Sequence, residues 1–283
     1  MIKIGQYNDL RISRFTDFGV YLTDDDPGSE PSEVLLPARY VDPDAVVGDS
    51  MEVFVYTDSE DRPVAVTERP FACVDEFAFL QVVQVNKVGA FLDWGLPKNL
   101  LCPFSEQKVK MHPGGIYLVY VYLDPHTGRV VASAKVNRFL GNVFPDYEPG
   151  AEVTALVTGH NEVGYQVIVD NRHRGMIYDN EAYRPLELEN STTAWVKKVR
   201  DDGKIDLTLT RPGTSDRIAE VSEQIMKMLQ DGTLALTDRS TPEQIKDVLH
   251  CSKKDFKKAV GHLYKLRQIE ITDDGLSLAP AKN

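Results

Sequence analysis

A glycine-centred motif that recurs three times constrains the fold of this chain more than any other feature. The segments around Gly19, Gly89 and Gly164 align with one another at intervals of 70 and 75 residues. A short apolar run follows each glycine, and the three runs are EVLLP ending at Pro37, NLLCP ending at Pro103 and RGMIY ending at Tyr178. A fixed period of this kind predicts three copies of one small unit. The first copy is longer by a polar insertion, residues 24–33, which predicts a loop.

Each copy also carries a second block that predicts a β-hairpin. Residues 47–66 and 113–133 share the pattern V-aromatic-V-Tyr-x-Asp, and in both a polar turn and a second alternating strand follow. The third version, residues 193–210, is more diverged and turns at Asp201-Asp202-Gly203. About five short strands in roughly 70 residues favour a small closed barrel over a sandwich. We therefore predict three tandem, closed five-stranded barrels.

The C-terminal quarter changes from strand to helix periodicity after the turn-rich break at residues 211–213. Residues 218–232 place apolar side chains on one helical face, and Gly232 provides the C-cap. A second helix is predicted after an N-cap at Thr241, and a third after a capping box that begins at Ser252. The buried stripe of the third helix is expected at Phe256, Val260 and Leu263. With the hairpin predicted in residues 268–278, this order describes a winged helix.

These patterns predict a mainly β chain with a C-terminal α+β domain. The expected domains are residues 1–70 for the first barrel, 71–144 for the second, 145–213 for the diverged third and 214–283 for the winged helix-turn-helix. A chain of 283 residues with 42% hydrophobic residues can bury a core.

The repeat unit resembles the S-one type of OB fold, an RNA-binding barrel. More closely, the segments YLVYVYLDPHTGRVVAS, RHRGMIYDNEAY and WVKKVRDDGKIDLTL, with the winged-helix tail, resemble the conserved virulence factor B family. This resemblance covers essentially the whole chain. It implies a bacterial RNA-binding regulator that acts in post-transcriptional control of gene expression. We hypothesise that a single-stranded RNA crosses the third barrel and the winged helix, and that the second barrel extends this path.

Aromatic side chains near the repeated glycine are the expected base-stacking residues. In the barrels that this sequence resembles, one aromatic precedes the glycine and one follows two residues after it, and a stacked base contributes about 1–3 kcal/mol. The first copy matches both positions with Phe18 and Tyr21, and the second keeps Phe91. The third copy matches neither position, although Tyr165 and Tyr178 lie near the same region. Trp94 lies at odd spacing from Phe91, so on a regular strand the two face opposite sides and one of them belongs to the core. Packing at the barrel end is the alternative role for both.

Clustered cations are the expected phosphate contacts, and several alternatives stay open for them. On the strand of the third copy, alternation predicts Lys198 and Arg200 on the same face as Val196. Strand cations also guard a barrel edge against pairing, and the lysines of the third helix also suit a docking face for the acidic first barrel. The candidate RNA-binding residues are Lys87, Phe91, Lys98, Arg172, His173, Arg174, Tyr178, Lys197, Lys198, Arg200, Lys253, Lys254, Lys257 and Lys258, with Phe18 and Tyr21 as weaker candidates.

The charge distribution argues against phosphate binding by the first barrel. The net charge of the chain is −11, and residues 1–70 hold 6 Lys or Arg against 15 Asp or Glu. Such a surface repels nucleic acid unless the charges are segregated, so Phe18 and Tyr21 also suit a protein contact.

The sequence shows no motif for catalysis, a metal or a cofactor, and we expect none of the three. HExxH, GxSxG, a Walker lysine loop and a dinucleotide fingerprint are all missing, although scattered carboxylates can build a nuclease site without a motif. Asp24 to Asp26 lie in a polar loop and are expected to be solvated. Three separated cysteines, no signal-peptide pattern and no long apolar run lead us to expect a cytoplasmic protein without a membrane partner. A DNA-binding transcription regulator and a protein adaptor, associated with a ribosome or a nuclease, are the alternative functions, and the oligomeric state stays open.

Overall fold

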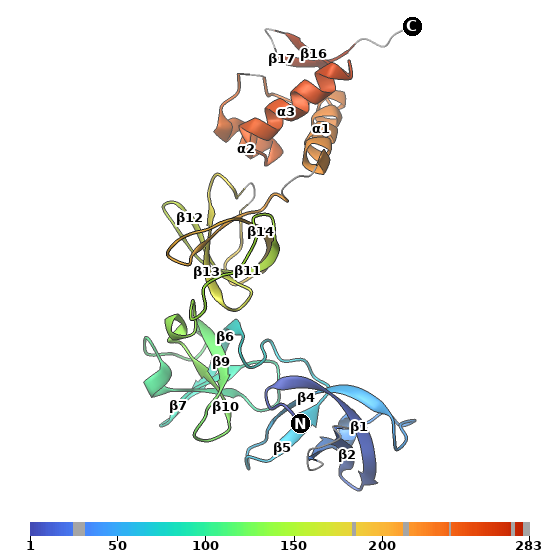
Figure 1. Cartoon of the computed structure of the whole chain (residues 1–283), viewed down its shortest axis with the longest axis vertical. Helices are drawn as coiled ribbons and strands as arrows, with labels where there is room; N and C mark the ends of the chain where they lie inside the picture. The colour runs from blue at the N-terminus through green and yellow to red at the C-terminus, as the bar shows by residue number, and fades with distance from the viewer. Residues whose placement is uncertain (25–31, 183–184, 212–214, 238, 273–274, 280–283) are drawn as a thin grey trace. The chain divides into compact units, whose positions relative to one another are not determined.

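The computed structural model describes residues 1–24, 32–182, 185–211, 215–237, 239–272 and 275–279 (Figure 1). The chain divides into two compact units, residues 1–140 and 141–283. Most of the polar insertion predicted at residues 24–33, with Asp25 and Asp26, and most of the break predicted at residues 211–213 lie outside the described residues.

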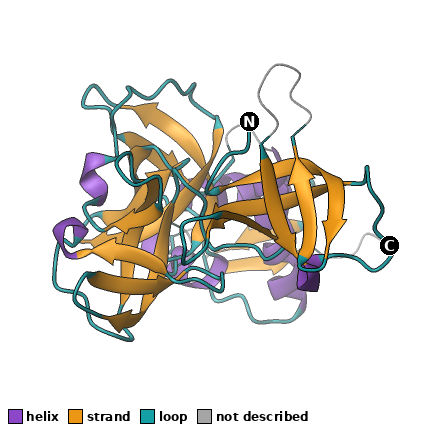
Figure 2. Ribbon diagram, turned by 90° about the horizontal axis from the view of Figure 1, so that it is seen from below, coloured by secondary structure: helices purple, strands orange, loops and turns teal. Residues whose placement is uncertain are grey.

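Unit 1 contains two closed five-stranded barrels, and unit 2 contains a third, so the prediction of three barrels is confirmed (Figure 2). The strands of the first barrel are β1 (Gln6–Thr16), β2 (Gly19–Thr23), β3 (Glu33–Pro37), β4 (Ser50–Thr57) and β5 (Pro63–Val66). Those of the second are β6 (Phe77–Val85), β7 (Gly89–Asp93), β8 (Leu100–Pro103), β9 (Ile116–Leu123) and β10 (Val130–Ser133). Those of the third are β11 (Glu152–Asn161), β12 (Gly164–Val169), β13 (His173–Tyr178), β14 (Ser191–Val199) and β15 (Ile205–Thr208). In each barrel the third and fifth strands close the sheet as a parallel pair.

The repeated glycine opens the second strand of every barrel because a side chain has no room there. A Cβ on Gly19, Gly89 or Gly164 would lie 2.0, 2.4 or 2.3 Å from a carbonyl oxygen of the neighbouring strand. Gly19 and Gly164 also adopt φ values of +146° and +153°, which side-chain-bearing residues avoid. Close approach of two backbones, rather than a turn alone, therefore explains the motif.

The first strand of every barrel carries a β-bulge at the equivalent position. The register shifts between Ile12 and Arg14 in β1, between Val82 and Gln84 in β6, and between Val157 and Gly159 in β11. A bulge increases the local twist and bends the strand, which a closed barrel of short strands requires. The sequence pattern did not predict these bulges.

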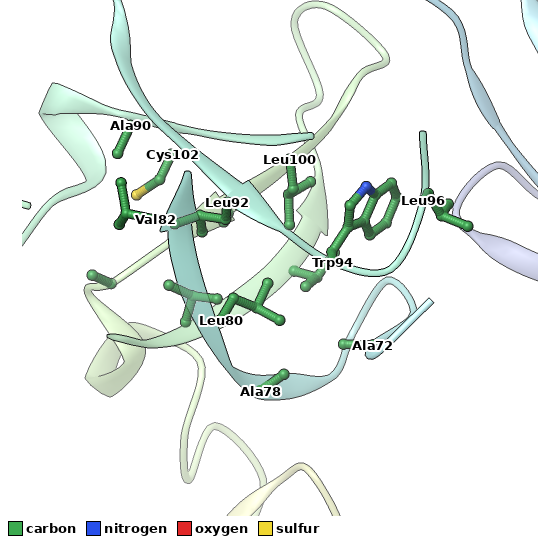
Figure 3. Packing of buried hydrophobic residues seen from close by; sticks show 14 of the residues in the cluster. Ala72, Ala78, Leu80, Val82, Ala90, Leu92, Trp94, Leu96, Leu100 and Cys102 are labelled. Atoms are coloured by element: carbon green, nitrogen blue, oxygen red, sulfur yellow. The ribbon is translucent and has the colours of Figure 1, made fainter. Parts of the chain in front are cut away.

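The interior of the second barrel is continuous with apolar residues of the first. Trp94 is only 2% exposed, and Figure 3 shows its indole between Leu96 and Leu100, near Ala72. Phe54 of β4 belongs to the same buried cluster. The prediction that one member of the pair Phe91 and Trp94 belongs to the core is confirmed, since Trp94 fills that role.

The C-terminal domain is a winged helix, as predicted. Its elements are α1 (Ser215–Gln230), α2 (Pro242–Leu249), α3 (Lys253–Lys265), β16 (Ile269–Thr272) and β17 (Gly275–Leu278). Thr241 and Gln244 form the predicted capping box of α2. Ser252 caps α3 by accepting a hydrogen bond from the Asp255 backbone N–H, but the capping box predicted there is wrong. The Asp255 carboxylate accepts from the Ser252 hydroxyl at 2.7 Å instead of from the Ser252 backbone N–H. None of the described helices is long and apolar enough to cross a membrane.

The helical core contains the stripe predicted for α3. Phe256, Val260 and Leu263 are at most 2% exposed, and they share one cluster with Val221 and Ile225 of α1. Ile218, Met228 and Leu229 are partly buried against the same cluster. The helical periodicity read from the sequence is therefore confirmed in both helices.

Candidate nucleic-acid interface

The outer face of the second barrel carries a row of side chains across four strands. Gln84 of β6 pairs with Phe91 of β7, Phe91 with Leu101 of β8, and Leu101 with Val131 of β10. Cross-strand partners lie on the same face of a sheet. The residues on either side of Phe91, Ala90 and Leu92, are fully buried in the barrel interior. Phe91 therefore lies half-buried on the outer face, where a base can reach it.

Trp94 and Lys98 join the second barrel to the first. The indole packs edge-on against Phe54 and Tyr56, with ring centroids 5.8 and 6.2 Å apart, and its Nε1–H donates to the carbonyl oxygen of Lys98 at 2.6 Å. The Lys98 ammonium in turn donates to the carbonyl oxygens of Thr57 at 2.9 Å and of Asp58 at 2.6 Å. Burial at this junction lowers the pKa of Lys98. Lys87 lies exposed in the turn before β7.

A cavity of about 460 Å³ lies at this junction and is lined by both barrels. The outward row that contains Phe91 forms one wall, and the turn between β4 and β5 forms another. Arg129 forms an ion pair with Asp61 of that turn. Phe91 and Lys98 were predicted from the sequence, whereas Arg129 and Asp61 were not, because these two residues lie 68 positions apart.

The aromatic pair of the first barrel is only partly available for stacking. Phe18 is 78% exposed, whereas Tyr21 is half-buried beneath the guanidinium of Arg14, 3.7 Å from the ring centroid. Glu33 holds Arg14 in place at 2.9 Å and, through this hydrogen bond, raises the pKa of Arg14. A base that stacks on Tyr21 must therefore displace Arg14 or use the opposite face of the ring.

The basic segment of the third barrel separates into exposed arginines and a buried histidine. Arg172 and Arg174 are exposed on either side of His173, which is 5% exposed and lies edge-on to Tyr147 at 5.7 Å. Alternation along β13 explains this arrangement. Burial lowers the pKa of His173, so its neutral form is favoured.

The cations of β14 are placed differently from the simple alternation predicted. Val196 is fully buried while Lys198 is exposed, so the prediction that they share a face is wrong. The cause is a bulge, because the register shifts between Val196 and Lys198 and Lys197 is the extra residue. Lys197 forms an ion pair with Glu181 at 2.6 Å.

Arg200, Tyr178 and Asp206 form a cluster beside that bulge. The Arg200 guanidinium contacts the Asp206 carboxylate at 2.6 Å and also donates to the Tyr178 hydroxyl. The hydrogen bond to Asp206 raises the pKa of Arg200. The cluster fixes the orientation of the Tyr178 ring, and Lys198 of β14 is exposed beside it.

The third helix presents its lysines opposite the winged-helix core. Lys254, Lys257 and Lys258 are exposed and Lys253 is half-buried, while Phe256 faces the core. Residues three and four apart share a helix face, so the three exposed lysines form one cationic surface. Cations in the first turns oppose the helix dipole, so this surface does not serve the stability of α3.

Comparisons with known proteins agree with this architecture. Residues 223–278 match the family model of the CvfB-like winged helix domain, and residues 4–68 match that of the S1 domain. The chain is 29% identical to the uncharacterized protein YitL of Bacillus subtilis (strain 168), over 93% of this chain and 90% of that protein. It is 26% identical to conserved virulence factor B of Staphylococcus aureus (strain USA300), over 84% and 82% of the two chains. The resemblance predicted from the sequence is thereby confirmed.

Two solved structures are also similar. A multidomain protein with nucleic acid binding domains from Streptococcus pneumoniae is 23% identical, with 97% of this chain and 98% of that chain covered and a TM-score of 0.39. The Drosophila Unr CSD456 structure is 11% identical, with 72% and 95% covered and a TM-score of 0.19.

Proposed function

We propose that this relative of the conserved virulence factor B proteins, which combines an S1 domain with a CvfB-like winged helix domain, binds single-stranded RNA and acts in post-transcriptional control. S1 and winged helix domains indicate nucleic-acid binding as the class of function. The observation that carries the proposal is the cationic surface of α3, formed by Lys254, Lys257 and Lys258 on a helix whose opposite face is buried.

Exposed cations of the third barrel support the same proposal. Arg172, Arg174 and Lys198 all project from the barrel into solvent. Arginine binds phosphate bidentately and also stacks on bases, which suits a strand whose bases are unpaired. Lys197 and Arg200 already have carboxylate partners, so we expect them to contribute less.

A titration with labelled nucleic acids tests the proposal. The anisotropy of a mixed-sequence single-stranded RNA and of a matched DNA duplex is measured with the full chain at several salt concentrations. We expect tighter binding to the RNA and a steep salt dependence, with a slope of about 0.7 per phosphate contact. Tighter binding to the duplex would instead support a transcription regulator that acts through the winged helix.

Neutralising substitutions identify the surface that binds. Lys254→Gln, Lys257→Gln and Lys258→Gln together are expected to reduce the salt slope by about 2, which is three contacts at about 0.7 each. Lys108→Gln with Lys110→Gln is the control, since both lysines are exposed, belong to the second barrel and are not among the proposed contacts. An unchanged slope in the triple variant would remove α3 from the site. The absence of saturable binding by the unmodified chain would leave a protein adaptor as the function.

A further inference from the structure

We propose that the cavity between the first and second barrels is a nucleotide pocket, in which a base lies on Phe91 and the phosphate is held by Lys98 and Arg129. This inference rests on the proposed function and deepens it, because it gives the acidic first barrel a part in the site. The cavity is formed within residues 1–140, so no other domain is needed to complete it.

The apolar wall of the cavity suits a planar base. Phe91, Leu101 and Val131 are register partners on neighbouring strands, so their side chains form one continuous patch. Tyr56 and Trp94 line the cavity as well. A volume of about 460 Å³ lies within the range of about 300–1,000 Å³ that small-molecule sites occupy. One nucleotide therefore fits, whereas a stacked run of several does not.

The cationic side of the cavity suits a phosphate. An ammonium has three N–H donors, and two of those on Lys98 are used by the carbonyl oxygens of Thr57 and Asp58. No third acceptor is described for it, so one donor is available to a ligand that enters the cavity. Arg129 lines the same cavity and has donors beyond those that contact Asp61. The charged residues of the lining are Lys98, Arg129 and Asp61, so the lining carries a net charge of +1.

Two amides complete the polar part of the lining. The side chains of Gln84 and Asn99 line the cavity and make no hydrogen bond with another described residue. A carboxamide presents both donors and acceptors, which is the chemistry that reads the edge of a base. An apolar patch with a few convergent polar groups is the usual composition of a ligand pocket.

The ion pair between Arg129 and Asp61 links the ligand to the first barrel. Asp61 lies in the β4–β5 turn with a φ of +64°, a backbone conformation that non-glycine residues rarely adopt. A phosphate that binds Arg129 must share it with this carboxylate. The turn therefore acts both as a wall of the pocket and as a competitor for its cation.

The nucleotide has two sources, and one experiment distinguishes them. The full chain, labelled with ¹⁵N, is titrated with the free monophosphates AMP, GMP, CMP and UMP and, separately, with a short single-stranded RNA. The readout is the amide shift of Phe91, Leu101 and Arg129. The anisotropy of the same RNA is measured in parallel, because it reports binding anywhere on the chain.

We expect the three amides to shift with RNA, and Arg129→Gln to weaken this local response at least tenfold. Lys108→Gln, which removes a cation of the same barrel outside the cavity, is the control and leaves it unchanged. Shifts with free monophosphates alone support the pocket and assign it to a free nucleotide. Unchanged amides while the RNA still binds would overturn the pocket and leave the proposed function intact. Unchanged amides without RNA binding would overturn both.

Discussion

Substitution of Lys98 by methionine tests whether its ammonium holds the first two barrels together. The substitution keeps most of the apolar stem and removes hydrogen bonds to Thr57 and Asp58. A hydrogen bond from a charged donor contributes about 1.5–3 kcal/mol, so two contribute about 3–6 kcal/mol at most. Water replaces part of this at a half-buried site, and methionine also removes the cost of burying the charge. We therefore expect the free energy of unfolding of unit 1 to fall by about 2–3 kcal/mol.

Tryptophan fluorescence measures this change in the full chain. The sequence has two tryptophans, Trp94 in unit 1 and Trp195 in unit 2, so Trp195→Phe leaves a reporter in unit 1 alone. With a urea dependence of about 2 kcal/mol per molar, the midpoint should fall by about 1 M. Lys87→Met is the matched control, because Lys87 is exposed and should leave the midpoint within about 0.2 M. An equal midpoint for Lys98→Met and the control would refute the role of this lysine at the junction.

Three further predictions concern stability. Because burial lowers the pKa of His173, the unfolded chain binds more protons than the folded chain just below pH 6.5. Amide exchange in β13 should therefore show a free energy of unfolding that falls as the pH drops through this range, by at most about 1.4 kcal/mol per pH unit, and a value that does not change with pH would contradict this. Gly89→Ala should lower the urea midpoint of unit 1 by at least about 1 M, since the new Cβ would lie 2.4 Å from the Cys102 carbonyl oxygen. A midpoint like that of the unmodified chain would show that β7 and β8 can move apart to admit the side chain. A Cβ at Gly261 of α3 has open space around it, so Gly261→Ala should stabilise the winged helix by about 1 kcal/mol, measured as increased amide protection. A loss of protection would contradict the placement of Gly261 in the interior of a helix.

The strands and helices could be predicted from the sequence because the patterns that produce them are local. The repeated glycines, the alternating hairpins and the helical stripes each depend on neighbours a few residues away, and all three barrels and the winged helix agree with them. The bulge at Lys197 shows where local reasoning ends. A bulge depends on how the partner strand closes the barrel, so the simple alternation used for β14 assigned Lys198 to the wrong face.

Contacts between residues distant in sequence determine the candidate site even more than they determine the strands and helices. Phe91 was predicted because it follows Gly89 by two residues, as Tyr21 follows Gly19. The roles of Trp94 and Lys98, in contrast, depend on residues of the first barrel about 40 positions away. Similarly, nothing in the local sequence distinguishes Arg129 from other hairpin arginines until Asp61 is placed beside it. Pattern analysis thus identifies which residue types are available, whereas the junction between barrels decides which of them share a cavity.

The acidity of the first barrel is compatible with a nucleotide site if that barrel positions cations instead of contacting phosphate. The end of β4 and the β4–β5 turn supply the carbonyl oxygens of Thr57 and Asp58 to Lys98, and the turn also supplies the Asp61 carboxylate to Arg129. On this argument Asp61→Asn removes a competitor for Arg129, so we expect tighter nucleotide binding, most visibly at low salt where exposed charges are least screened. Amide titration of Asp61→Asn and of the unmodified chain at two salt concentrations measures this change. Weaker binding by Asp61→Asn would show instead that the carboxylate holds Arg129 in its binding orientation and does not compete with the ligand.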